Sequence, residues 1–213
     1  MSRFLIAFSL VASLTGSAMA EGHFAQPPVP AVAELRVAPH FEVSRSAVRA
    51  KLIAQRAANL DRFRIYQRGG VFPSNTYSDT KLNVWRDSAG HFCAAATIIR
   101  MSGLTDLVER VAEQNNFIRL ADVKQGPLMD WILTSGFTQD EIAAIQEPFE
   151  PVVRRPREPV EPDMRTVEDQ RLIKKYKQVD RMLVKNQKAS IELAVDRLMA
   201  HPALAAQLVH SES

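Results

Sequence analysis

The distribution of proline constrains the fold of this 213-residue chain more than any other feature. Of its 12 prolines, four lie in residues 27–39 and five in residues 148–162. Proline fixes φ and removes a backbone donor, so both windows are typical of linkers. Regular structure is therefore expected in a body over residues 41–147 and in a segment over residues 163–200, which contains neither proline nor glycine.

Local signals predict that the body is mainly α, a small helical bundle. The first expected helix follows Ser44 or Ser46 as a cap and ends near Gly69, because apolar residues recur at helical spacing between them. Three shorter helices are expected from caps, a leading proline and apolar spacing, over residues 104–114, 127–134 and 138–146. Weak alternation in residues 81–87 predicts a short strand, and residues 81–96 fit either a hairpin or a strand followed by a helix.

The segment 163–200 is expected to be one long charged helix. Its apolar positions follow 4-3-4 spacing at Leu172, Tyr176, Val179 and Leu183. The pattern breaks at Asn186 and Ser190, whereas a coiled coil would sustain it. This stripe either packs back on the body or meets a protein partner or second copy, and we take the four apolar residues as the candidate interaction surface. Residues 201–213 are expected to be a tail.

The first twenty residues have the pattern of a bacterial-type secretory signal. Arg3 precedes an apolar core over residues 4–14, and residues 18–20 form an A-x-A cleavage site. The protein is therefore expected to be exported, to the periplasm or the medium. No cysteine follows the core, so no lipid anchor is expected there, and no later segment predicts a transmembrane span.

Basic residues are concentrated in the first expected helix. Residues 44–68 carry seven, with Asp61 as the sole acid, whereas residues 69–149 carry six basic and ten acidic groups. The seven are Arg45, Arg49, Lys51, Arg56, Arg62, Arg64 and Arg68. The simplest interpretation is internal charge complementarity, and the alternative is binding to an anionic lipid or polymer surface. Glycine-rich loops and zinc spacing are missing from the sequence, which disfavours nucleic acid.

Cys93 is the only cysteine, and it lies just before an alanine-rich run. The stretch from Gly90 resembles the start of the nucleophile helix in papain-like and cell-wall peptidase cysteine hydrolases, which implies a thiol activated at a helix start. His91 is the local candidate base, but it shares a face with Cys93 only on a strand. The later histidines, His201 and His210, lie in the tail. A buried core thiol is the competing interpretation.

No histidine or cysteine spacing typical of a metal site and no cofactor-binding motif is found in the sequence. The leading hypothesis is therefore a non-enzymatic envelope or extracytoplasmic interaction module without a cofactor. The alternatives are a Cys93-dependent hydrolase or acyl-transfer enzyme and an anionic-surface binder.

Overall fold

A computed structural model describes residues 43–152 and 164–211. The predicted signal, all of the first proline-rich window and most of the second lie outside these residues. The fold is mainly α, as the sequence predicts. Its elements, in chain order, are α1 (Arg45–Gly69), α2 (Ala94–Met101), α3 (Thr105–Gln114), the 3-10 turn η1 (Leu120–Asp122), α4 (Pro127–Thr134), α5 (Gln139–Ile145), α6 (Met164–Met199) and α7 (Pro202–His210).

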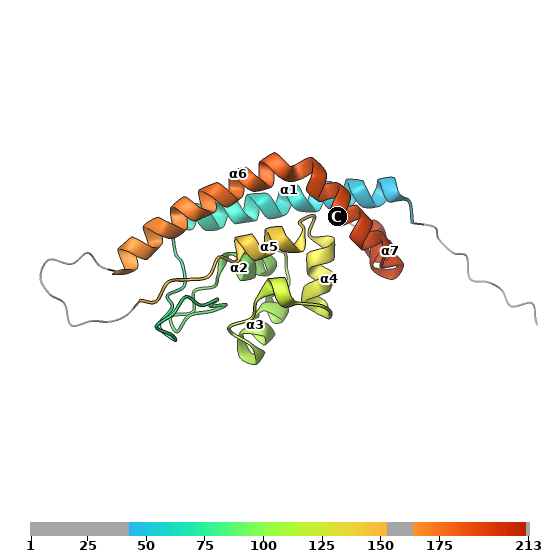
Figure 1. Cartoon of the computed structure of the whole chain (residues 1–213). Coiled ribbons are helices and arrows are strands. Elements are labelled where there is room, and N and C mark those ends of the chain that lie inside the picture. Colours follow the sequence, from blue (N-terminus) through green and yellow to red (C-terminus); the bar gives the residue numbers. More distant parts are fainter. Residues whose placement is uncertain (1–42, 153–163, 212–213) are drawn as a thin grey trace, which may run out of the picture. The chain divides into compact units, whose positions relative to one another are not determined.

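The long helices α1 and α6 lie side by side and run antiparallel (Figure 1). The short helices α2, α4 and α5 pack beneath them, and α3 packs against α2. Between the two layers lies a core of fully buried side chains. Its largest members include Phe63 of α1, Trp85, Ile98 of α2 and Tyr176 of α6. The apolar stripe predicted on the long helix is therefore used to close this core.

Helix boundaries follow the local signals closely. The capping box of Thr138 and Glu141 is present at the start of α5, and Pro127 begins α4. Helix α1 begins after Ser44 as expected, but its left-handed stop is Gly70 rather than Gly69. Gly69 is the last helical residue, and the left-handed conformation falls on Gly70, whose φ is +64°.

Two expectations about the segments between helices are corrected. Residues 81–87 form no strand; Arg86 and Phe92 make one isolated bridge, a hairpin-like turn that leads directly into α2. The expected tail holds α7, which Pro202 begins and which contacts α1, α4 and α6. The start of the second proline window is packed, because buried Phe149 pairs with Leu82 through two backbone hydrogen bonds.

A buried ion pair joins both layers. The Arg56 guanidinium of α1 donates two hydrogen bonds to the Glu141 carboxylate of α5, at 2.7 and 2.8 Å. It also donates to the carbonyls of Gly136 and of Leu183 in α6. Glu141 accepts further bonds from Ser190 Oγ and the Thr138 N–H. Arg56 is 2% exposed and Glu141 5%, so the charges are desolvated but fully paired.

The surroundings of Glu141 determine its protonation. Burial alone would raise its pKa, but the hydrogen bonds from Arg56, Thr138 and Ser190 outweigh this and lower it below the ordinary 4.5. Stability from the ionised form is therefore fully present above pH 4.5 and is lost as pH falls through the lowered folded pKa.

We expect Glu141→Gln to lower the free energy of unfolding by about 3–5 kcal/mol at neutral pH, because it leaves the Arg56 charge buried and uncompensated. The difference in the free energy of unfolding between the variant and wild type should become smaller as the pH falls through the lowered pKa, where wild-type Glu141 also becomes neutral. Urea unfolding at neutral and at acidic pH measures this difference. Glu192→Gln, which removes a half-exposed partner of Arg45 and Arg49, is the matched control and should cost no more than about 1 kcal/mol.

Gly136 allows α1 to approach the turn between α4 and α5. Its φ is +79°, and a Cβ there would lie 2.3 Å from the Leu52 carbonyl oxygen and 2.7 Å from the Arg56 nitrogen. Gly70 also has a positive φ, but a Cβ there meets nothing within 4 Å. We expect Gly136→Ala to cost about 3 kcal/mol or more and Gly70→Ala about 1–2 kcal/mol, measured by thermal or urea unfolding. An equal loss of stability in the two variants would contradict the explanation that Gly136 is needed because the backbone of α1 lies so close to it.

Candidate functional site

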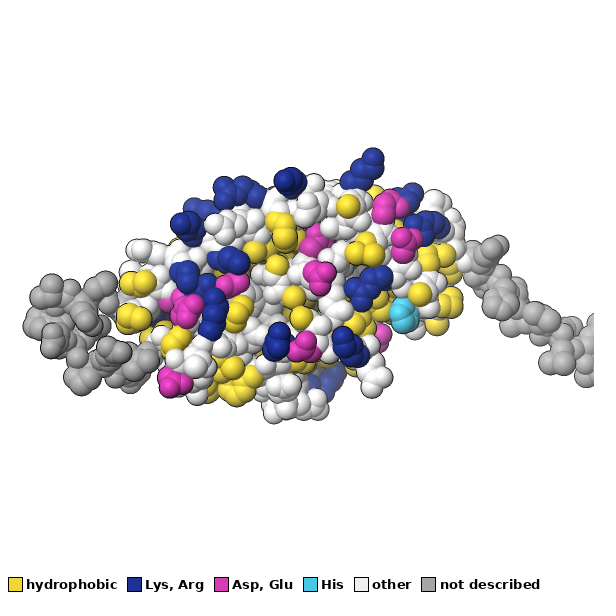
Figure 2. All heavy atoms as spheres, in the orientation of Figure 1, with side chains coloured by type: hydrophobic (Ala, Val, Ile, Leu, Met, Phe, Trp, Pro, Cys, Tyr) yellow, Lys and Arg dark blue, Asp and Glu magenta, His cyan; other side chains and the backbone are white. Residues whose placement is uncertain are grey.

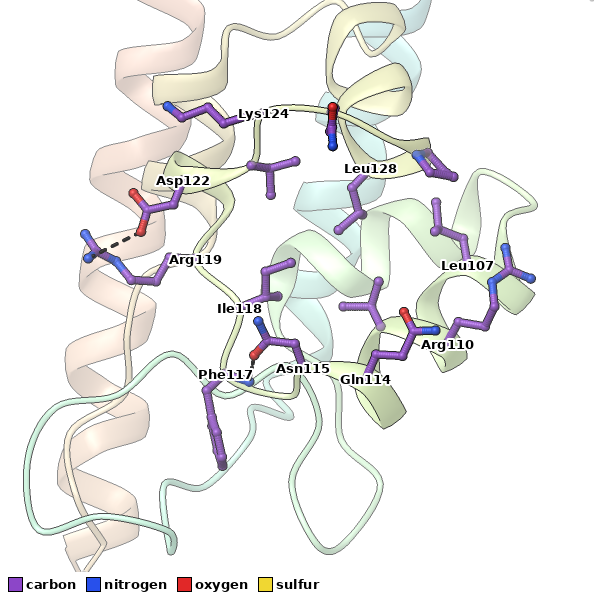
Figure 3. Close-up of a pocket in the computed structure, with 14 residues that line it drawn as sticks. Leu107, Arg110, Gln114, Asn115, Phe117, Ile118, Arg119, Asp122, Lys124 and Leu128 are labelled. Carbon is purple, nitrogen blue, oxygen red and sulfur yellow. Dashed lines mark hydrogen bonds and ion pairs between the residues drawn. The ribbon is translucent and has the colours of Figure 1, made fainter. Parts of the chain in front are cut away.

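A groove of about 660 Å³ lies between α3 and the segment that leads into α4 (Figure 3). Apolar side chains from both sides form its floor. They are Leu107 and Val111 of α3, Ile118 and Val123 of the connecting segment, and Leu128 of α4. Phe117, 41% exposed, stands at one end and stacks edge-on against Tyr77 at 5.3 Å between ring centroids.

The connecting wall is irregular, yet it is held by side-chain hydrogen bonds from Gln139 of α5 and from Gln146, which caps the end of α5. The Gln146 side chain donates to the Ile118 carbonyl at 2.8 Å and accepts from the Leu120 N–H at 2.8 Å. The Gln139 amide donates to the carbonyls of Leu120 and Val123. Two glutamines thus take the place of a regular backbone ladder and fix this side of the groove.

The opposite wall is positioned by the segment before α2. The Asn116 side chain pairs with both the N–H and the carbonyl of Arg86, at 2.9 and 2.8 Å. Trp85 Nε1 donates to the Val108 carbonyl of α3 at 3.0 Å. These contacts hold α3 against the buried core, so the groove has two rigid sides.

Three cations surround the apolar floor. Arg110, Arg119 and Lys124 are exposed, and Asp122 is the single acid in the lining. Asp122 lies 3.5 Å from Arg119, whereas Arg110 and Lys124 form no ion pair with any residue described. The rim is therefore net positive over an apolar surface. No sequence pattern predicts this rim, because its residues are irregularly spaced and come together only in the fold.

The structure places Cys93 at the start of α2, as the resemblance implies, but inside the core. It is the N-cap residue, its side chain is fully buried, and its sulfur accepts a hydrogen bond from the Ala96 N–H. Burial raises the pKa of Cys93 to about 12 and outweighs the opposing hydrogen bond from Ala96. The thiol is therefore neutral at physiological pH, the opposite of an activated nucleophile.

His91 is directed to a carboxylate rather than to the thiol. Its Nδ1 lies 3.1 Å from Asp87 Oδ2. Asp87 also accepts from the backbone N–H groups of Ser74, Ala89 and His91. His91 and Asp87 thus close the turn before α2.

The four apolar residues proposed as a partner surface lie in the core. Leu172, Tyr176 and Leu183 are fully buried, and Val179 is nearly so. Tyr176 contacts Phe63, Tyr66 and Phe72 with ring centroids 5.5–5.6 Å apart. They are therefore core residues of the α1–α6 pair rather than the interaction surface expected from the sequence.

The basic residues of α1 are mostly paired within the chain. Arg45 and Arg49 bind Glu192, Arg64 binds Asp180, and Arg56 binds Glu141. Arg62 donates to the Asn59 side chain, and Arg68 is exposed at the end of the helix. Internal complementarity is thus present, but most of the acidic partners lie on α6. This pairing argues against α1 as the anionic-surface binder.

Comparison of the chain with protein-family models, with curated proteins and with solved structures finds no match. None of the helices described is both long enough and apolar enough to cross a membrane. Within residues 43–152 and 164–211, no three His, Cys, Asp or Glu side chains are placed to share a metal ion.

We expect Cys93 to react with iodoacetamide only after denaturation, because the folded thiol is buried and protonated. Mass spectrometry at about pH 8 measures the label. A Ser88→Cys variant is the matched control, since residue 88 is exposed in the turn five residues earlier. It should gain one label in the folded state. Labelling of Cys93 in the folded wild type would restore the nucleophile hypothesis.

Proposed function

We propose that this chain is a non-enzymatic interaction module of the extracytoplasmic space that binds a segment of a partner protein in the groove between α3 and α4. The segment would carry apolar residues for the floor and Asp or Glu for the rim. The observation that carries the proposal is the combination of an apolar floor with three surrounding cations.

The dimensions and chemistry of the groove support a peptide segment. Its volume of about 660 Å³ lies in the range of ligand sites. Apolar surface continues beyond it, since Phe117 at one end and Leu104, just before α3, are both exposed. Peptide grooves bind through a few apolar anchors, and surrounding charges select the partner and its orientation.

The rigidity of the groove also supports binding. Its walls are held by the Gln139, Gln146 and Asn116 side chains before any ligand arrives. A preformed site loses less conformational entropy on binding than one that must first order. No observation of this kind supports the alternative hypothesis of a Cys93-dependent hydrolase, because the Cys93 thiol lies in the core.

Selection of a displayed random peptide library on the purified chain tests the proposal. We expect the enriched peptides to combine Leu, Phe or Trp with Asp or Glu. The triple variant Arg110→Gln, Arg119→Gln, Lys124→Gln should bind them roughly tenfold more weakly, because the rim changes from net positive to net negative. Fluorescence anisotropy with the enriched peptides measures the change.

The control is the triple variant Lys177→Gln, Arg181→Gln, Lys185→Gln, which removes the same charge from the exposed face of α6. It should bind the peptides as wild type does. Equal weakening in both triple variants would mean that net charge alone attracts the peptides, and enrichment of peptides without acids would remove the role of the rim.

A further inference from the structure

The outer face of α6 carries a row of five exposed cations. They are Lys174, Lys177, Arg181, Lys185 and Lys188. Their 3-4-4-3 spacing places them on one side of the helix. The buried residues Leu172, Tyr176, Val179 and Leu183 lie on the opposite side. At 1.5 Å per residue, the row is about 21 Å long.

No ion pair joins any of these five cations to a residue that the structure describes, in contrast to the arginines of α1. Asp180 is the only acid between residues 170 and 191, and it is turned toward Arg64 of α1. The whole chain has a net charge of only +3, so this row is a local concentration and not a general excess. Basic side chains lie along the edge of the molecule formed by α6 (Figure 2).

Apolar side chains flank the row. Ile173 is 38% exposed and Val184 49% exposed, and both lie on one border of the basic face. Lys and Arg combined with exposed aliphatic residues are suited to the surface of a bilayer, where the cations meet headgroups and the aliphatic groups reach the acyl boundary. A soluble polyanion would use the cations but leave Ile173 and Val184 in water.

The inner side of α6 makes this face rigid. Arg171 near its start binds Glu147 and Glu168, and Arg56 binds the Leu183 carbonyl near its middle. The long helix is thereby fixed along its length against the body, with its basic face outward. Ordering of the helix is already complete before it meets a surface, which reduces the entropy cost of binding.

We propose that the outer face of α6 binds the surface of an anionic lipid bilayer. The contact is peripheral: Lys174, Lys177, Arg181, Lys185 and Lys188 meet the headgroups, and Ile173 and Val184 reach the boundary below them. The surface is distinct from the α3–α4 groove and does not depend on it. A module placed in this way binds a membrane with one layer of its fold and leaves its groove free.

Co-sedimentation with lipid vesicles tests the proposal. The protein used is the chain without the predicted signal, residues 21–213, which includes every residue that the structure describes. We expect binding to vesicles of equimolar phosphatidylglycerol and phosphatidylcholine, no binding to phosphatidylcholine alone, and a steep fall with added salt. The triple variant Lys177→Gln, Arg181→Gln, Lys185→Gln should lower the partition coefficient roughly a hundredfold, because each basic residue near an anionic surface contributes about fivefold.

The groove variant Arg110→Gln, Arg119→Gln, Lys124→Gln is the matched control, with the same change in charge, and should bind the vesicles as wild type does. Equal loss in both variants would overturn the proposal. So would binding to soluble polyphosphate without binding to anionic vesicles. Circular dichroism verifies that both variants are folded, and the peptide assay on the groove succeeds or fails independently of this result.

Discussion

The structure depends on the buried ion pair between Arg56 and Glu141. A charged pair inside a core is stable only when its remaining donors and acceptors are also bonded. Here the guanidinium also binds the Gly136 and Leu183 carbonyls, and the carboxylate also accepts from the Ser190 hydroxyl and the Thr138 N–H. Satisfying one guanidinium and one carboxylate therefore requires α1, α5, α6 and the turn after α4 to meet at the same point.

This requirement explains three local irregularities. Arg56 lies on the apolar side of α1 between Leu52 and Leu60, where a charge would otherwise be unfavourable. Ser190 interrupts the apolar pattern of α6 because its hydroxyl donates to Glu141. Gly136 lacks a side chain where the backbone of α1 approaches. Each of these residues is only a weak signal in the sequence, but in the fold all three belong to the same contact.

The same packing separates two sets of basic residues that have similar sequence patterns. Both α1 and α6 carry many Lys and Arg at helical spacing. The arginines of α1 border α6 and find Asp180, Glu192 and Glu141 within reach. The outer cations of α6 face away from every element packed against it. The sequence predicts internal charge complementarity for the basic residues of α1, with an anionic surface as the alternative, but which acids pair with them depends on the neighbouring helix across the interface.

Some features of the candidate sites were predictable and others were not. Cys93 was expected near a helix start, and it caps α2. Its exposure depends on packing with distant segments: the thiol is fully buried and close enough to Tyr66 of α1 and Tyr176 of α6 to interact with them electrostatically, which no local pattern predicts. The groove was not predicted, because Arg110, Arg119 and Lys124 share no helical or strand period.

By itself, the sequence determined the mainly helical class and most helix ends, since caps, prolines and apolar spacing act over one or two turns of chain. The tertiary structure alone decided which apolar stripe is core, which cations are neutralised and where the groove lies. These properties depend on burial and on Coulomb partners from distant segments, such as Arg56 and Glu141, 85 residues apart. Local sequence patterns cannot predict such a pair, because side chains lose water and charges come within reach of one another only once the helices have packed.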